Sequence, residues 1–62
     1  MKIRDVLKLL RDDGWAIVRT RGSHRQLKHT RKPGLVTVAG HPSHDLAPAT
    51  LKSILRQAGL EP

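Results

Sequence analysis

The chain of 62 residues is short and basic, because twelve Lys and Arg stand against five Asp and Glu and give a formal charge of +7. A domain of this size buries only about 60% of the surface of its unfolded chain, which leaves little room for a deep pocket beside a core. Function is therefore expected on a surface or in a shallow groove. The sequence has no cysteine, which excludes disulfides and thiolate metal sites. We expect a single domain spanning residues 1–62.

The sequence also indicates a location. No apolar run approaches the roughly 18 residues that a transmembrane helix needs. Residues 1–5 lack the apolar stretch of a signal peptide. We therefore expect a cytoplasmic protein without a membrane partner.

Residues 2–13 have the spacing of an amphipathic helix. Apolar residues recur at positions i, i+3, i+4 and i+7, namely Ile3, Val6, Leu7 and Leu10. Gly14 lies where a left-handed C-terminal cap is expected. Residues 15–20 then form a β-rich run that begins with Trp15, which we expect in the core.

A turn over residues 21–23 is expected next, with Gly22 supplying the positive φ that a tight hairpin often requires. Residues 24–29 form a second, weaker strand. Alternation places His24, Gln26 and Lys28 on one face, and Arg25, Leu27 and His29 on the other. Leu27 is the only strong core residue among them, so its face should meet the helices. His24 then points to the open side, unless a bulge near the turn reverses the faces.

The second half of the chain repeats these signals. Residues 30–34 form a loop, residues 35–39 a third strand and residues 40–47 an irregular segment. A second helix begins at Pro48 and ends at Gly59. Its apolar stripe consists of Leu51, Ile54, Leu55 and Ala58.

The order α-β-β-β-α predicts an α+β fold. The sheet has one apolar face and each helix has one apolar stripe. All of these apolar surfaces are buried when both helices pack on one face of the sheet. The predicted structure is a three-stranded antiparallel sheet with two helices on one face. This layout resembles that of the double-stranded-RNA-binding domain.

The charge is concentrated in the middle of the chain. No Asp or Glu lies between Gly14 and His44, a pattern that favours a polyanionic partner over simple solubilising charge. Trp15 is the only aromatic residue besides histidine, so RNA would be bound through phosphates and shape rather than stacking. The candidate RNA-binding residues are Arg19, Arg21, Ser23, Arg25, Lys28, Arg31 and Lys32.

Four histidines have three competing interpretations. His41 and His44 have an i, i+3 spacing, but only Asp45 lies near them, so we expect no metal site. Polar surface is the favoured interpretation for His29 and His44. His24 follows the Gly-Ser turn at the start of a strand, which holds its backbone while leaving the ring exposed, and it lies centrally in the basic window.

Acid–base chemistry on RNA explains why a histidine belongs in such a window. RNA carries its own nucleophile, the 2′-hydroxyl, and imidazole titrates near neutral pH and is suited to take its proton. Fixed cations stabilise the negative charge that gathers on the phosphoryl oxygens. We therefore predict His24 as general base, aided by Arg25 and Lys28, with a second histidine or water as the acid.

The chain resembles the HicA-type mRNA interferase toxins of bacterial toxin–antitoxin pairs. The resemblance covers nearly the whole chain in order. It is carried by Asp13-Gly14-Trp15, Arg19, Gly22-Ser23-His24-Arg25, Lys28-His29, Val36-Thr37-Val38 and the closing stretch from Asp45-Leu46 through Leu51 to Leu60. Many members have Phe at the position of Leu27 and Gly at that of Ala49, and His44 replaces a residue that is often charged or polar.

The resemblance implies a type II toxin with a double-stranded-RNA-binding-like fold. It implies an endoribonuclease that cleaves mRNA without ribosomes, metal or other cofactor. It also implies that His24 is essential and that an antitoxin of the HicB type holds the toxin inactive.

Two alternatives remain open at this point. A non-catalytic RNA-binding module would use the same basic surface and would bind RNA without cleaving it. A pure interaction protein would instead use that surface to recognise an acidic protein.

Overall fold

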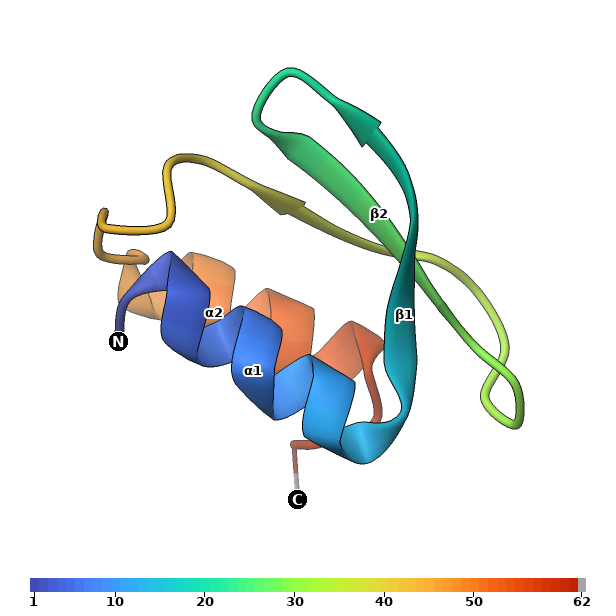
Figure 1. The fold of residues 1–62 in the computed structure, drawn as a ribbon. Coiled ribbons are helices and arrows are strands. Elements are labelled where there is room, and N and C mark those ends of the chain that lie inside the picture. Colours follow the sequence, from blue (N-terminus) through green and yellow to red (C-terminus); the bar gives the residue numbers. More distant parts are fainter. Residues whose placement is uncertain (62) are drawn as a thin grey trace.

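The structure, a computed structural model, describes residues 1–61 and has the predicted order of elements (Figure 1). These are α1 (Ile3–Asp13), β1 (Trp15–Arg21), β2 (His24–His29), β3 (Val36–Ala39) and α2 (Pro48–Gln57). The strands form one antiparallel sheet in the order β1-β2-β3, and both helices lie on the same side of it. This arrangement confirms the α+β, double-stranded-RNA-binding-domain-like prediction.

At both ends of α1, backbone groups of the helix form hydrogen bonds with neighbouring backbone groups. Gly14 takes the left-handed conformation expected of a C-cap, with φ of 107°, and its N–H donates to the carbonyl of Arg11. At the N-terminus, the N–H of Ile3 donates to the carbonyl of His44 at 2.9 Å, and that of Arg4 to Pro42 at 3.0 Å. The segment after β3 therefore fixes the start of α1, because it accepts hydrogen bonds from donors that have no partner within the helix.

The core lies between the sheet and the two helices. Its buried residues are Ile3, Val6, Leu7, Leu10, Trp15, Leu27, Val36, Val38, Ile54 and Ala58. Trp15 is 2% exposed, which confirms the expectation that it belongs to the core. Of the predicted apolar stripe of α2, Ile54 and Ala58 are buried, whereas Leu51 and Leu55 pack against this cluster and are only partly buried.

The element boundaries differ slightly from those predicted. β1 continues through Arg21, which leaves a two-residue turn at Gly22 and Ser23, and Gly22 has the expected positive φ of 59°. β3 starts at Val36 because Leu35 is outside the ladder and 45% exposed. Within residues 1–61, neither helix has the length and apolarity needed to cross a bilayer.

Candidate functional site

The face of the sheet turned away from the helices is built around β2. His24 lies opposite Arg21 on β1 and Ala39 on β3, while Gln26 lies opposite Arg19 and Thr37. Directly opposed residues project to the same side of an antiparallel sheet, with their Cβ atoms about 5 Å apart. We call this side the open face. It carries Ala16, Arg19, Arg21, His24, Gln26, Lys28, Thr37 and Ala39. The predicted facing of His24 is confirmed.

A bulge in β1 brings two arginines to the open face. The register shifts between Ile17, which opposes Leu27, and Arg19, which opposes Gln26, so Val18 is an extra residue. Strict alternation would put Arg19 and Arg21 on the side of Trp15, toward the helices. The extra residue reverses that alternation and turns both arginines to the side of His24. Sequence alternation alone gives no signal for this bulge.

These side chains surround a shallow depression. It is lined by Arg19, Arg21, His24, Gln26 and Thr37 and has a volume of about 210 Å³. Enclosed small-molecule pockets are larger, about 300–1,000 Å³. The depression is therefore suited to one part of a larger ligand. Among the residues that line it, His24 is the one with an imidazole, a side chain type that can act as a general base.

Two further predicted residues lie close to this depression without lining it. Lys28 is on the open face opposite Ala16, four residues along β2 from His24, which corresponds to roughly 13 Å. Ser23 is exposed in the turn that precedes His24, and its carbonyl accepts the N–H of Gly40 at 3.1 Å. Lys28 is thus placed to contact a neighbouring part of an extended ligand.

Arg25 lies on the other side of the sheet. It opposes Thr20 and Val38, on the side that faces the helices. Its Nη1 donates to the carbonyl oxygens of Gly40 at 3.0 Å and Ser23 at 3.3 Å. The structure therefore does not bring its guanidinium beside the His24 imidazole, although the two residues are adjacent in sequence.

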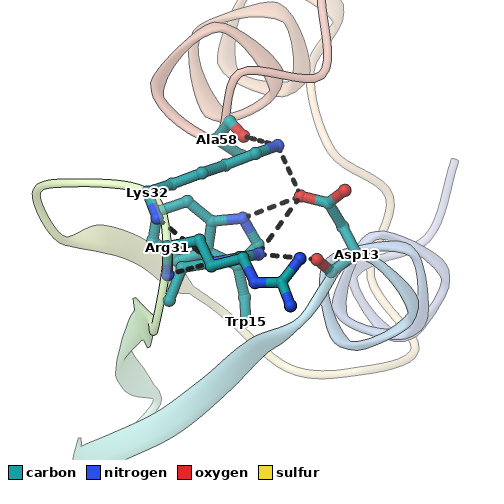
Figure 2. A network of polar contacts seen from close by, with 6 residues as sticks. Asp13, Trp15, Arg31, Lys32 and Ala58 are labelled. Atoms are coloured by element: carbon teal, nitrogen blue, oxygen red, sulfur yellow. Dashed lines mark hydrogen bonds and ion pairs between the residues drawn. The ribbon is translucent and has the colours of Figure 1, made fainter.

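Lys32 is held in a network at the C-terminal end of α1 (Figure 2). Its Nζ donates to the Asp13 carboxylate at 2.7 Å and to the carbonyl of Ala58 at 3.0 Å. The same carboxylate accepts the indole N–H of Trp15 at 3.2 Å. Lys32 thus links α1 with the end of α2 on the helix side, away from the depression.

His29 belongs to this network, so the prediction that it is an ordinary surface histidine is wrong. Its side chain is 9% exposed, packs edge-on against Trp15, and donates from Nε2 to the Asp13 carbonyl at 2.7 Å. Its Nδ1 accepts the backbone N–H groups of Arg31 and Lys32 at 2.9 and 3.2 Å. These contacts assign the Nε2–H tautomer. We call this set of residues, Asp13, Trp15, His29, Lys32 and Ala58, the Asp13 network.

The electrostatics of the Asp13 network follow from its geometry. The hydrogen bond from the Lys32 ammonium is the main cause that lowers the pKa of Asp13 below its usual value, against a smaller opposing effect of burial. Arg31, which precedes Lys32 in the loop after β2, is exposed and is not among the residues that line the depression.

The remaining histidines lie in the loop after β3. His41 and His44 are exposed, with ring centroids 5.3 Å apart, and Nδ1 of His41 contacts the hydroxyl of Ser43 at 2.9 Å. The exposure of His44 agrees with its interpretation as polar surface. Within residues 1–61, no group of three or more His, Cys, Asp or Glu is placed to hold a metal ion.

The fold and the open face together define a small basic α+β domain of the double-stranded-RNA-binding-like class. Residues 3–60 match the family described as the HicA toxin of bacterial toxin–antitoxin systems, which covers nearly the whole chain. The chain belongs to this family and is a toxin of a toxin–antitoxin pair. No curated protein gives a match to the sequence.

Proposed function

We propose that this toxin is a metal-independent endoribonuclease that cleaves mRNA, with His24 as the general base on the 2′-hydroxyl. The observation that supports it is the meeting of His24 with Arg19 and Arg21 around one depression on the open face. Membership of the HicA toxin family makes RNA the first substrate to consider. Arg19 and Arg21 take the place that Arg25 had in the sequence prediction.

The reaction needs only groups that RNA and this face supply. The His24 imidazole accepts the proton of the 2′-hydroxyl while the 2′-oxygen forms a bond to the adjacent phosphorus. The bond from phosphorus to the 5′-oxygen breaks, and that oxygen takes a proton from water. The imidazolium then returns its proton to solvent. Arg19 and Arg21 stabilise the negative charge on the phosphoryl oxygens. DNA lacks the 2′-hydroxyl and is not cleaved.

Binding of the RNA strand is expected to rest on phosphate contacts. Lys28 on the open face and Ser23 in the turn extend the site along and beyond β2. Because the single tryptophan is buried in the core, it offers no platform for base stacking. Recognition therefore depends on charge and shape, and it weakens as salt concentration rises.

Cleavage by a His24→Ala variant tests the catalytic assignment. Wild-type protein, His24→Ala and His44→Ala are incubated with RNA in buffer containing EDTA, and the products are separated on a gel. His44 is another exposed histidine, in the loop after β3, so its variant controls for the loss of a histidine. Cleavage by His24→Ala should fall by about 10²- to 10⁴-fold, the usual contribution of a general base.

The same gel separates the alternatives. Cleavage by His24→Ala at the wild-type rate would sink the assignment of His24. Salt-dependent RNA binding without products, for all three proteins, would instead favour a non-catalytic RNA-binding module.

The partner is proposed to be an antitoxin of the HicB type in the cytoplasm. A toxin of this family pairs with an antitoxin, and an acidic protein is suited to the basic open face. Antitoxin added before RNA should then stop cleavage, while His24→Ala should still bind it.

A further inference from the structure

Arg25 is adjacent in sequence to His24, the proposed base, but its side chain lies on the opposite side of the sheet. Its guanidinium Nη1 donates to two carbonyl oxygens, those of Gly40 at 3.0 Å and Ser23 at 3.3 Å. The residue is only partly exposed. A guanidinium used in this way has a defined position, on the side of the sheet opposite to the open face.

The two carbonyls lie at the same end of the β2–β3 pair, one beside each strand. Ser23 ends the turn before β2, and Gly40 follows the end of β3, where Ala39 opposes His24. The N–H of Gly40 also donates to the Ser23 carbonyl at 3.1 Å. The backbone before His24 is therefore tied to the end of β3 by one direct hydrogen bond and by the bridging side chain of Arg25.

Gly40 is itself fixed against α1. A Cβ atom built on this residue would lie 2.5 Å from Cδ1 of Ile3, so the backbone packs directly on the first turn of the helix. Ile3 is buried, and its N–H donates to the carbonyl of His44, which lies in the same loop after β3 as Gly40. The bridge from Arg25 thus connects the turn before His24 to a loop that packs against the first turn of α1.

We propose that Arg25 is a positioning residue for His24. It clamps the Ser23 and Gly40 carbonyls, and so holds the backbone of His24 where the imidazole meets Arg19 and Arg21. This inference rests on the proposed ribonuclease function and replaces the earlier expectation that Arg25 contacts phosphate. Misplacement of a reacting group by about 1 Å can cost on the order of 100-fold in rate, so such a clamp has a measurable effect on cleavage.

Steady-state cleavage distinguishes a clamp from a phosphate ligand. Arg25→Gln and Arg25→Lys are compared with wild type and with Arg4→Gln, which removes one exposed arginine charge on α1. If Arg25 is a clamp, kcat of Arg25→Gln falls by about tenfold or more while KM stays within about twofold. Arg25→Lys keeps a donor for the carbonyls and recovers part of kcat. Arg4→Gln behaves as wild type.

If Arg25 is instead a phosphate ligand, its loss should change KM rather than kcat. Loss of one phosphate contact raises KM, leaves kcat nearly unchanged and makes the dependence of log affinity on log salt shallower by about 0.7 for a single strand. That result would overturn the proposal. Circular dichroism reports whether Arg25→Gln is folded, and if it is not, the kcat and KM of Arg25→Lys decide in the same way.

Amide hydrogen exchange tests the clamp without cleavage. The Gly40 amide donates to the Ser23 carbonyl. In Arg25→Gln its exchange with solvent should become about tenfold faster relative to that of the Val6 amide of α1. The reason is that the contact between Ser23 and Gly40 can then open locally, without unfolding of the helix. Equal changes at both amides would contradict a clamp whatever the cleavage shows. If Gly40 responds but wild type cleaves no RNA, the clamp stands as a structural feature and its catalytic role fails together with the proposed function.

Discussion

Asp13 connects three elements through one side chain and one carbonyl. Its carboxylate accepts hydrogen bonds from Lys32 in the loop after β2 and from Trp15 at the start of β1, and its carbonyl accepts Nε2–H of His29. The Lys32 ammonium, which also bonds the carbonyl of Ala58, is the main reason that the pKa of Asp13 is lowered. The ionised carboxylate is therefore favoured more in the folded than in the unfolded chain.

This difference predicts how stability depends on acid. Because the folded pKa lies below the ordinary value of 3.8, the contribution of Asp13 is complete above that value and is lost as pH falls through the folded pKa. Urea unfolding of wild type and Asp13→Asn, followed from neutral pH into the acid range, should show a difference in unfolding free energy that narrows at low pH. Trp15 and His29 keep acceptors in this variant, so the pH-dependent part reports the carboxylate.

Asp12→Asn is the matched control for this experiment. Asp12 pairs with Lys8 at 2.8 Å, but both side chains are mostly exposed, and such surface pairs contribute little. Its stability should follow wild type at all pH values. A difference between wild type and Asp13→Asn that stays constant with pH would show that the ion pair with Lys32 is not responsible.

At this scale, sequence reasoning succeeded where the cause is local. The facing of His24 follows from alternation around Leu27, and the C-cap follows from Gly14. Alternation also placed Arg25 and His29 on the side of the helices, where the structure has them. The contacts of Arg25, His29 and Lys32 were not predicted, because their partners include backbone carbonyls far along the chain, such as those of Gly40 and Ala58. No pattern of side chain types signals a carbonyl acceptor.

At the scale of elements, the β1 bulge determines the composition of the site. Arg19 and Arg21 reach the open face because Val18 is an extra residue opposite β2. Thr20, between the two arginines, opposes Arg25 on the side of the helices. Neighbouring positions in this strand thus have opposite consequences for an RNA ligand, although their side chains are all exposed.

Exchanging two neighbours tests the bulge without changing composition. The double variant Arg19→Thr/Thr20→Arg keeps the net charge and moves one cation from the open face to the helix side. Its kcat/KM for RNA should fall by about tenfold or more, because one of the two arginines that stabilise the phosphoryl oxygens is lost from the open face. A melting curve confirms folding. Unchanged cleavage in a folded variant would mean that the face occupied by Arg19 is irrelevant.

The elements themselves were largely predictable, since apolar spacing, Gly14 and Pro48 mark the helices and β-rich runs mark the strands. The bulge was not, because Val18 suits a regular strand as well as an irregular one. The start of β3 shifted by one residue for a similar reason, as Leu35 has the character of a strand residue but lies outside the ladder.

At the scale of the molecule, the two sides of the sheet differ in charge. All five acidic residues lie on or beside the helices: Asp5, Asp12 and Asp13 in α1, Asp45 before α2 and Glu61 after it. Several are paired there, including Asp12 with Lys8 and Glu61 with Arg56 and Lys52. The open face carries Arg19, Arg21, Lys28 and His24 without an acid. This separation makes the open face the basic side of the molecule, as the proposed contact with RNA requires.

The overall architecture follows from the sequence because so few arrangements bury every apolar stripe. Two amphipathic helices and three strands with one apolar face have a simple common solution, which the structure adopts. The basic window between Gly14 and His44 likewise predicted a polyanion-binding region. The sequence did not reveal how the cations of this window are distributed in space. Some of them lie on the open face and others lie on the side of the helices.

The chemical nature of the cut RNA ends tests the proposed mechanism most directly. Attack by the 2′-oxygen, with His24 as base, must leave a 2′,3′-cyclic phosphate on one fragment and a 5′-hydroxyl on the other. We predict these ends for wild-type protein acting in the presence of EDTA, identified by mass spectrometry of the fragments. Fragments carrying a 5′-phosphate and a 3′-hydroxyl would contradict the mechanism, because water rather than the 2′-hydroxyl would then be the nucleophile.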